Sequence, residues 1–454
     1  MSNIHRISFD TLALDFHNPQ ERFGAWRESF FQTDLGKIYR AIPWLELIGV
    51  FGLKRPRCGP AGTFGPQGKL ALMFLKSYSQ LSDRKLIEQL NGNLHWQIFC
   101  GIYIPPDSPI RDFKVVSKIR CELAAILGKC THGVQKALAR HWKPYMSQTN
   151  VMLTDATCYE SSVRYPTSAK ILWESVEWMY RELVDACGVL GIRRPRTKYL
   201  KWERRYGQYS RKRKRRRKER RSLIRGLLRL LAKLLAEMDR IIQAHNWQPL
   251  PRHRGRREVI DRVLEQQQMW FFDQQKSKGI IVSLAKPYLR PIIRGKEIKP
   301  VEFGAKVNKI QVDGINFIET LSFDAFNEGT KLRNSIFLSR RLFGRIDAVG
   351  ADSIYATNKN RRYCTGKQIT TDFKRKGRAG RYEAQRKQLA RNITRERATR
   401  LEGSFGNEKN HFLLHRIKAM TKQTDALWIF FGIHTANALN IGRRIAAQNH
   451  RKAA

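Results

Sequence analysis

Apolar residues in the first part of the chain recur at spacings of three and four, the period of an α-helix that buries one face. From Lys69 this pattern predicts one helix, Ser82 is a typical N-cap for a second, and Ser108 followed by proline predicts the start of a third. Short helices joined by tight turns are typical both of helix-turn-helix DNA-binding domains and of small helical bundles, and periodicity does not separate the two. We therefore expect a helical N-terminal domain over residues 1–145.

A second helical region covers residues 172–275. Its apolar residues alternate spacings of three and four like the seam of a coiled coil, at Ile224, Leu227, Leu231, Leu234, Met238 and Ile241. The seam is shorter than three heptads, which favours an internal helical hairpin over a dimer zipper. Just before it, residues 211–221 read RKRKRRRKERR, a run of cations with one glutamate. Such a run is either a solvated arm or a contact to a phosphate backbone, and we favour the contact.

Strand-like runs lie on both sides of this helical region. VMLTDATCYESS contains a short apolar strand that we expect to end at Asp155, where an α/β sheet commonly builds a site. After the insertion, IIVSL, EFGAKVNKIQVDG and FIETLSF are predicted strands, with the Asp-Gly pair at 313–314 as a hairpin turn. A helix over about 327–343 and a strand that ends at Asp352 follow. The chain is thus predicted to be mixed α/β.

The basic stretch 391–418 predicts one long helix, and a C-terminal helix is expected over 426–454. Residues seven apart on an α-helix lie about 20° from superposition, so Arg395, Glu402 and Lys409 form one stripe. A single carboxylate among cations belongs to a solvated ion-pair face, or it binds a metal ion that bridges to a phosphate. Three carboxylates from separate elements, Asp155, Asp352 and Glu402, could then converge at one edge of a sheet and hold hard cations.

Charge narrows the class of protein. The 454 residues include 86 Lys and Arg against 39 Asp and Glu, a net charge of +47 that a polyanion would neutralise. With 42% hydrophobic residues, 10 Trp, 14 Tyr and 23 Phe, the chain is not a disordered basic tail. Seven cysteines without a CxxC pair indicate neither a disulfide framework nor a zinc site. No signal peptide or membrane-spanning run is evident, so we expect a cytoplasmic, nucleoid-associated protein.

Four segments in order resemble the DDE transposases of bacterial insertion sequences. They are DATCYESSVRYPTS from Asp155, KPYLRPIIRGKEIKPVEFGAKV from Lys286, ADSIYATNKNRRYC from Ala351 and RLEGSFGNEKNHFLLHRIKA from Arg400. Residues 67–125 resemble the helical N-terminal domain of the same group. The resemblance implies an RNase H-like mixed sheet with a helical insertion and a helical N-terminal DNA-binding domain. The catalytic domain would cover 146–425, interrupted by the insertion.

The resemblance also implies that Asp155, Asp352 and Glu402 are the catalytic, metal-binding triad. Two Mg²⁺ ions, or Mn²⁺ in their place, are expected, with Asp155 bridging both. Glu402 and Lys409 match the spacing of the family, but Ala398 stands where related transposases often carry arginine. Arg395, Arg397 and Arg400 are the alternatives for that role. The predicted DNA-binding residues are Lys409, Arg395, Arg397, Arg400, Arg361, Arg213, Arg215, Arg216 and Arg217.

The expected function is therefore a transposase that binds the terminal inverted repeats of its element and catalyses metal-dependent strand cleavage and transfer. Its partners would be double-stranded DNA, both element ends and target, and a second copy of the chain in the DNA complex. Two alternatives stay open at this point. One is a catalytically inactive, DNA-binding derivative of a transposase, and the other is an RNase H-fold nuclease without strand transfer.

Overall fold

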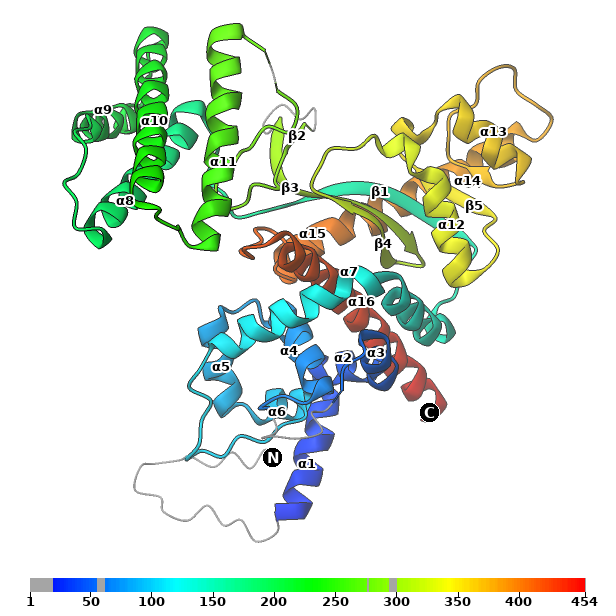
Figure 1. Ribbon diagram of the computed structural model, residues 1–454. Helices are drawn as coiled ribbons and strands as arrows, with labels where there is room; N and C mark the ends of the chain where they lie inside the picture. Colours follow the sequence, from blue (N-terminus) through cyan, green and yellow to red (C-terminus); the bar gives the residue numbers. More distant parts are fainter. Residues whose placement is uncertain (1–18, 55–61, 276, 294–299, 454) are drawn as a thin grey trace.

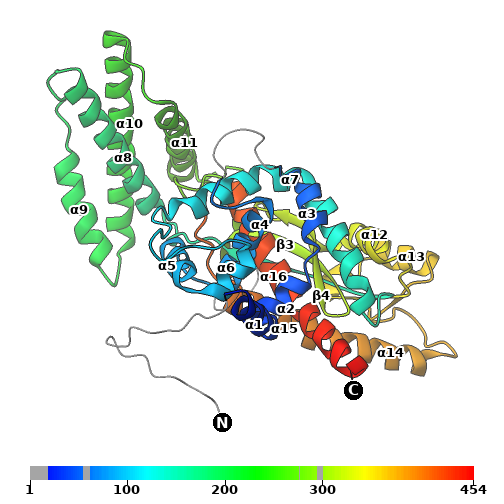
Figure 2. The ribbon, with the colours of Figure 1, turned by 90° about the horizontal axis from the view of Figure 1, so that it is seen from below.

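The computed structural model describes residues 19–54, 62–275, 277–293 and 300–453, and the structural statements below concern these residues. A mixed sheet lies at the centre (Figure 1), with a helical N-terminal body on one side of it. A helical insertion and helix α14 (Glu383–Glu396) lie at opposite ends of the molecule in both Figure 1 and Figure 2. The fold is thus the predicted mixed α/β class with a helical N-terminal region.

The described strands form one six-stranded sheet in the order β2-β3-β1-β5-β6, with β4 beside β3. β3 is antiparallel to β1, whereas β5 and β6 run parallel to β1. β2 and β4 share the outer edge of β3. This order and these directions are those of the RNase H-like sheet that was predicted. The strand bounds are β1 Val151–Glu160, β2 Pro291–Ile293, β3 Val301–Val312, β4 Ile315–Ser322, β5 Ala348–Ala351 and β6 Thr370–Thr371.

The β3–β4 hairpin turns at Asp313 and Gly314, both with positive φ (47° and 78°), as predicted for an Asp-Gly turn. The predicted strand IIVSL is not a strand, because its apolar side chains serve two different cores. Ile281 and Leu284 pack in the core of the insertion, and Val282 packs in the main core. The segment is therefore held by side-chain packing and carries no ladder of backbone hydrogen bonds.

Helices cover both faces of the sheet. α12 (Leu332–Phe343) packs on one face, where Thr154 of β1 meets Ser335 at 3.4 Å between hydroxyl oxygens. α14 and α15 (Glu402–His411) cover the other face, where Tyr159 of β1 hydrogen-bonds Glu408. Successive strand residues point to opposite faces, so Asp155 belongs to the face of α14 and α15.

The helical N-terminal body contains seven helices among the described residues. Ser82 caps α5 as predicted, accepting the N–H of Lys85 at 3.3 Å. The third predicted helix starts later, at Lys114, because Asn91 hydrogen-bonds both backbone groups of Ile110 and keeps that segment extended. A short helix, α6, was not predicted. The bounds are α1 Pro19–Gln32, α2 Asp34–Arg40, α3 Trp44–Phe51, α4 Pro66–Ser79, α5 Asp83–Gly92, α6 Leu94–Cys100 and α7 Lys114–Trp142.

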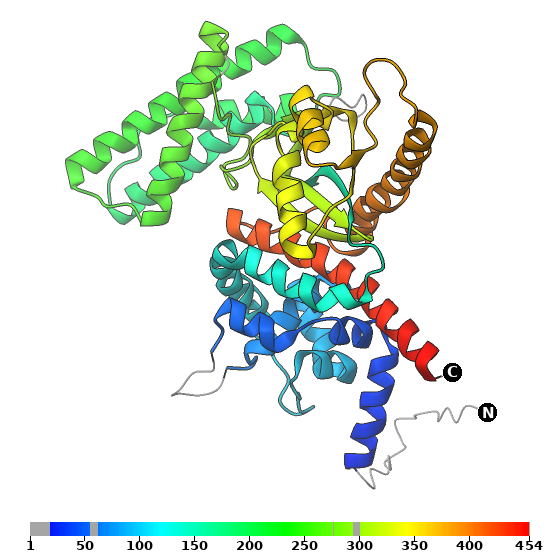
Figure 3. The ribbon, with the colours of Figure 1, turned by 90° about the vertical axis from the view of Figure 1, so that its right-hand side faces the viewer.

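The C-terminal helix α16 (Lys422–Ala453) ties this body to the sheet. It packs against α2, α4 and α7 and also against β4, and Figure 3 shows it running between the sheet and the N-terminal helices. The predicted N-terminal domain, 1–145, includes residues 1–18 and 55–61, which lie outside the described residues.

The insertion has a hydrophobic core of its own. All six seam residues of α10 are buried, and α10 packs on α8, α9 and α11 of the same chain. The seam is thus internal, as the sequence indicated. None of the described helices has the length and apolar character that a bilayer span requires. The insertion helices are α8 Ser168–Val189, α9 Tyr199–Arg211, α10 Arg217–His245 and α11 Pro251–Gln268.

Candidate active site

Two of the predicted acids come from neighbouring strands. β1 and β5 are parallel, and the last pair in their register is Thr154 with Ala351. Asp155 and Asp352 are therefore the next two opposed positions, at the point where the parallel pairing stops. The sheet register brings these two acids together although they are far apart in sequence.

Asp155 lies in the middle of its strand, so the prediction that the strand ends there is wrong. β1 continues to Glu160 because β3 pairs with it along that length. Asp352 does follow the end of β5, where its carboxylate accepts the N–H of Ser353 at 2.6 Å. Asp155 is half-buried and Asp352 is exposed.

Directly before Glu402 the chain forms a π-helical segment, η5 (Arg397–Leu401), between α14 and α15. The prediction of one α-helix over 391–418 is therefore wrong in two places, since the helix contains a π turn and ends at His411. A π turn takes about one residue more than an α turn. Consequently Arg395 and Glu402, seven residues apart, do not share the stripe that α-helical spacing predicts.

The π turn keeps the apolar side of this helix on the sheet. Ile393 and Leu401 are eight residues apart, which is about one α turn plus one π turn. Both pack with Leu153 of β1 in a small core. Gly350 of β5 permits this approach, since a Cβ there would lie 2.4 Å from Ile393. Arg397 lies midway between Ile393 and Leu401 and is therefore directed toward the sheet.

Arg397 is the arginine that lies among the acids. Its Nη1 is 3.7 Å from Oε1 of Glu402, and its Nε is 3.9 Å from Oδ2 of Asp372. Its side chain is 17% exposed, and its Nε–H is buried without a hydrogen-bond partner among the described residues. Of the three arginines considered for the place of Ala398, this is the one that the structure pairs with Glu402.

Burial raises the pKa of Asp155 to about 6, helped by the negative charges of Glu328 and Asp352 and opposed by the Ala156 N–H and the charge of Arg397. A carboxylate in this position gains from any further cation, because burial has removed water and neighbouring acids repel its charge. Glu328 was not predicted as a neighbour. It comes from the segment before α12 and is paired with Lys306 at 2.7 Å.

Within the described part of the chain, no three Asp, Glu, His or Cys side chains lie close enough together to hold one metal ion. Asp155 and Asp352 are neighbours in register, and Glu402 is connected to them through Arg397. The donor chemistry nevertheless fits a hard divalent cation, since all three donors are carboxylates and Asp155 is held in surroundings that disfavour its charge.

Lys409 lies farther along the same face of β1. Its Nζ is 3.2 Å from Oγ1 of Thr157 and 5.8 Å from the ring centre of Tyr159. Thr157 is two residues from Asp155 and therefore on the same face of the strand. Lys409 is thus placed beside the acids, whereas Arg395, on α14, is exposed.

The other predicted DNA-binding arginines lie elsewhere. Arg400 pairs with Glu396 at 3.0 Å and approaches Asp313 of the hairpin turn at 3.4 Å. Arg361 donates to the carbonyl of Ala356 at 3.0 Å and is only half-exposed. The cationic run at 211–221 forms the exposed tip of the α9–α10 hairpin and carries Arg213, Arg215, Arg216 and Arg217. In Figure 1 this hairpin lies at the opposite end of the molecule from α14.

Asp372 is a site residue that the sequence analysis missed. It directly follows β6, as Asp352 follows β5, and β5 and β6 are parallel. An acid after the second of two parallel strands was the available signal. The strand is only two residues long, and such a short segment carries no recognisable alternation.

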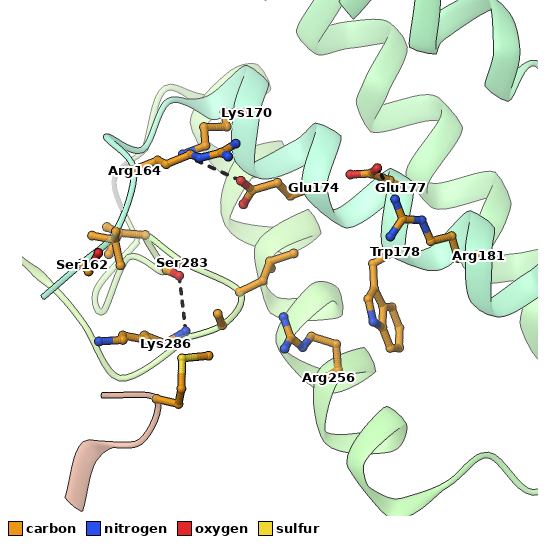
Figure 4. Close-up of a pocket in the computed structure, with 15 residues that line it drawn as sticks. Ser162, Arg164, Lys170, Glu174, Glu177, Trp178, Arg181, Arg256, Ser283 and Lys286 are labelled. Carbon is orange, nitrogen blue, oxygen red and sulfur yellow. Dashed lines mark hydrogen bonds and ion pairs between the residues drawn. The ribbon is translucent and has the colours of Figure 1, made fainter. Parts of the chain in front are cut away.

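A separate cavity of about 360 Å³ lies between the insertion and the sheet (Figure 4). Two of its cations have acidic partners in its wall. Lys170 lies 3.8 Å from Glu174, and Arg181 lies 2.5 Å from Glu177. Asp155, Asp352 and Glu402 do not line this cavity, so it is distinct from the site of Asp155.

Comparison with protein families gives two matches. Residues 28–122 match a family described as a transposase domain, and residues 349–434 match a family described as a transposase DDE domain. The second match includes Asp352, Glu402 and Lys409, while Asp155 lies outside both. No curated protein and no solved structure gives a match. Together with the RNase H-like order of the strands, the two family matches support a DDE transposase of an insertion sequence.

Proposed function

We propose that this transposase cuts DNA at the ends of its element and joins them to target DNA at the site of Asp155, Asp352 and Glu402. The observation that carries the proposal is the register of β1 and β5, which sets Asp155 beside Asp352. Glu402 lies on the helix that packs against the same face of the sheet, with Arg397 between the acids.

In this proposal Asp155, Asp352 and Glu402 would hold the divalent cations, Mg²⁺ or Mn²⁺. Bound ions of this kind activate the attacking oxygen, stabilise the leaving oxygen and offset charge on the phosphate. Arg397 leaves Glu402 and donates its unpaired N–H to a phosphate oxygen. Lys409 holds the neighbouring phosphate from its position over Thr157.

The exposed tip of the α9–α10 hairpin contacts the DNA backbone outside the site in this proposal. Its cations provide affinity without sequence choice, and the N-terminal helices select the element ends. If Arg213, Arg215, Arg216 and Arg217 each contact a phosphate, replacing all four by glutamine lowers the slope of log affinity against log salt by roughly 3–4. An unchanged slope would exclude the tip as a contact. A homodimer in the DNA complex is part of the same proposal, because two ends must be cut.

The decisive experiment replaces Asp155 by Asn and measures nicking of DNA that carries the terminal repeats, with Mg²⁺ present. We expect cleavage to be lost and affinity for the same DNA to be retained, because the change removes one negative charge and keeps the shape of the side chain. Equal loss of cleavage and binding would indicate a structural role for Asp155 and would contradict the proposal.

The same substrates test the two alternatives. A DNA-binding derivative without activity would bind the repeats and produce no nick in Mg²⁺ or Mn²⁺. A nuclease would nick them but would not join the freed 3′-hydroxyl to a second DNA. Short inverted repeats that flank the coding region, with a duplicated target beyond them, would support the transposase.

A further inference from the structure

Asp372 is nearly buried, with 4% of its side chain exposed, and it is held from two sides. Its Oδ1 accepts the N–H of Ala351 at 3.1 Å, the residue that precedes Asp352. Its Oδ2 is 3.9 Å from Nε of Arg397. A single carboxylate thus connects the end of β5 with the arginine that lies among the acids.

We infer that Asp372 is a positioning residue that acts through Arg397, which it holds beside the acids without letting it take their place. This inference rests on the proposed function of the site. The guanidinium has two acidic partners at nearly equal distance, Asp372 at 3.9 Å and Glu402 at 3.7 Å. Asp372 therefore competes with Glu402 for the same charge.

Binding of a metal ion by Glu402 would shift Arg397 toward Asp372. Glu402 must release the guanidinium before it can hold a cation, because a positive charge 3.7 Å from its Oε1 repels a second cation at the same carboxylate. Asp372 stays nearly buried behind Arg397 and gives the released charge a partner, so the guanidinium is not left unpaired. The side chain then remains within reach of a phosphate that approaches the acids.

A cavity beside Asp372 gives DNA access to this part of the site. Asp372 lines a cavity of about 770 Å³ between α14 and the segment that precedes it. Ala398, the neighbour of Arg397, lines it too. Glu383, also in the wall, pairs with Arg375 and Arg386, and the remaining cations of the wall are Lys374, Lys387, Arg391 and Arg395. These cations would guide a DNA phosphate toward Ala398, next to Arg397.

The test uses the full-length protein and two measurements, DNA cleavage and the thermal stabilisation by Mg²⁺ alone. Without Asp372, Arg397 binds Glu402 more firmly and competes with the cation. Asp372→Asn should therefore raise the Mg²⁺ concentration for half-maximal stabilisation and lower kcat by roughly 10–100-fold, the usual effect of residues behind a metal site. The KM for DNA should change little, because Asp372 does not itself contact DNA.

A double variant separates positioning from folding. If Asp372 acts through Arg397, then adding Asp372→Asn to Arg397→Gln should change neither the Mg²⁺ midpoint nor kcat further. A structural role would lower the melting temperature without Mg²⁺ by the same amount in both backgrounds. Asp372→Glu, which keeps the charge, should recover part of kcat. The matched control is Asp347→Asn at the other end of β5, where an exposed acid pairs with Arg345 at 2.6 Å, and it should behave as the unmodified protein.

Two results would overturn the inference while leaving the proposed function intact. One is a normal Mg²⁺ midpoint in Asp372→Asn, and the other is an additive loss in the double variant. If the unmodified protein shows neither Mg²⁺-dependent stabilisation nor cleavage, the proposed function fails and the inference fails with it.

Discussion

Glu402 and Glu408 lie on the same ten-residue helix, α15, yet their surroundings are opposite. Glu408 is fully buried and accepts hydrogen bonds from Lys309 at 2.6 and 2.8 Å, from Asn316 at 2.8 Å and from Tyr159. Glu402 has 53% of its side chain exposed and one cation nearby, at 3.7 Å.

The difference shows what makes a carboxylate available for chemistry. The oxygens of Glu408 are saturated by protein donors, and its charge is matched by the buried ammonium of Lys309, so it anchors α15 to β1 and β3. Glu402 is half-exposed, and its carboxylate is 3.7 Å from Arg397, too far for a hydrogen bond. Both acids occur in the same basic segment, and only their contacts distinguish the structural role of Glu408 from the catalytic role proposed for Glu402.

The largest effect should come from the buried pair. Glu408→Gln leaves the ammonium of Lys309 without a counter-charge in a fully buried position, and breaking such a pair costs about 3–5 kcal/mol. The free energy of unfolding in urea measures this loss. Glu396→Gln, which breaks a half-exposed pair with Arg400, is the control and should change stability by less than about 1 kcal/mol. Equal losses of unfolding free energy in the two variants would contradict the assignment of Glu408 as a structural anchor.

Glu402→Gln should lower the rate of DNA cleavage and leave the stability of the protein nearly unchanged. Transition-state stabilisation by a bound cation amounts to several kcal/mol, so cleavage should fall by roughly 10³-fold at about 1.4 kcal/mol per factor of ten. The free energy of unfolding should stay within about 0.5 kcal/mol, as for other exposed positions. Nicking rates on repeat DNA and urea titrations of the same preparation check both statements. A variant that loses stability and keeps cleavage would reverse the assignment of the two glutamates.

The smallest of the three effects concerns pH. The pKa of Asp155 rises from 3.8 to about 6 in the folded protein, chiefly through burial. The folded state therefore binds this proton more tightly than the unfolded state, and the stabilising contribution is present below about pH 4 and lost as pH rises to about 6. The full loss is roughly 3 kcal/mol.

Asp155→Asn removes this dependence. With a chelator present, the variant should gain stability over the unmodified protein between about pH 4 and pH 6, and the gain should be constant above that range. Urea unfolding at several pH values measures the difference, and the other titrating groups cancel because both proteins carry them. A difference that does not vary with pH would show that the pKa of Asp155 is the same in the folded and unfolded states, and it would contradict the prediction.

Several features were predictable because they depend on short stretches of chain. Asp313 and Gly314 form a hairpin turn since their backbone preferences are local, and the seam of α10 is buried since its spacing is helical. The late helix was predicted less well. Nothing in residues 391–418 reveals a π turn, because that turn arises from the fit of Ile393 and Leu401 to β1 and β5.

The sequence by itself determined the mixed α/β class, and its motifs led to the prediction of a DDE transposase with three candidate acids, because motifs and periodicity are properties of neighbouring residues. Only the tertiary structure decided that Arg397 and not Arg395 meets Glu402, that Asp372 stands behind it, and that Glu408 is buried. The physical reason is that contacts between distant segments set these features. They fix the register of β1 with β5, and they fix how Ile393 of α14 and Leu401 of η5 pack on both strands.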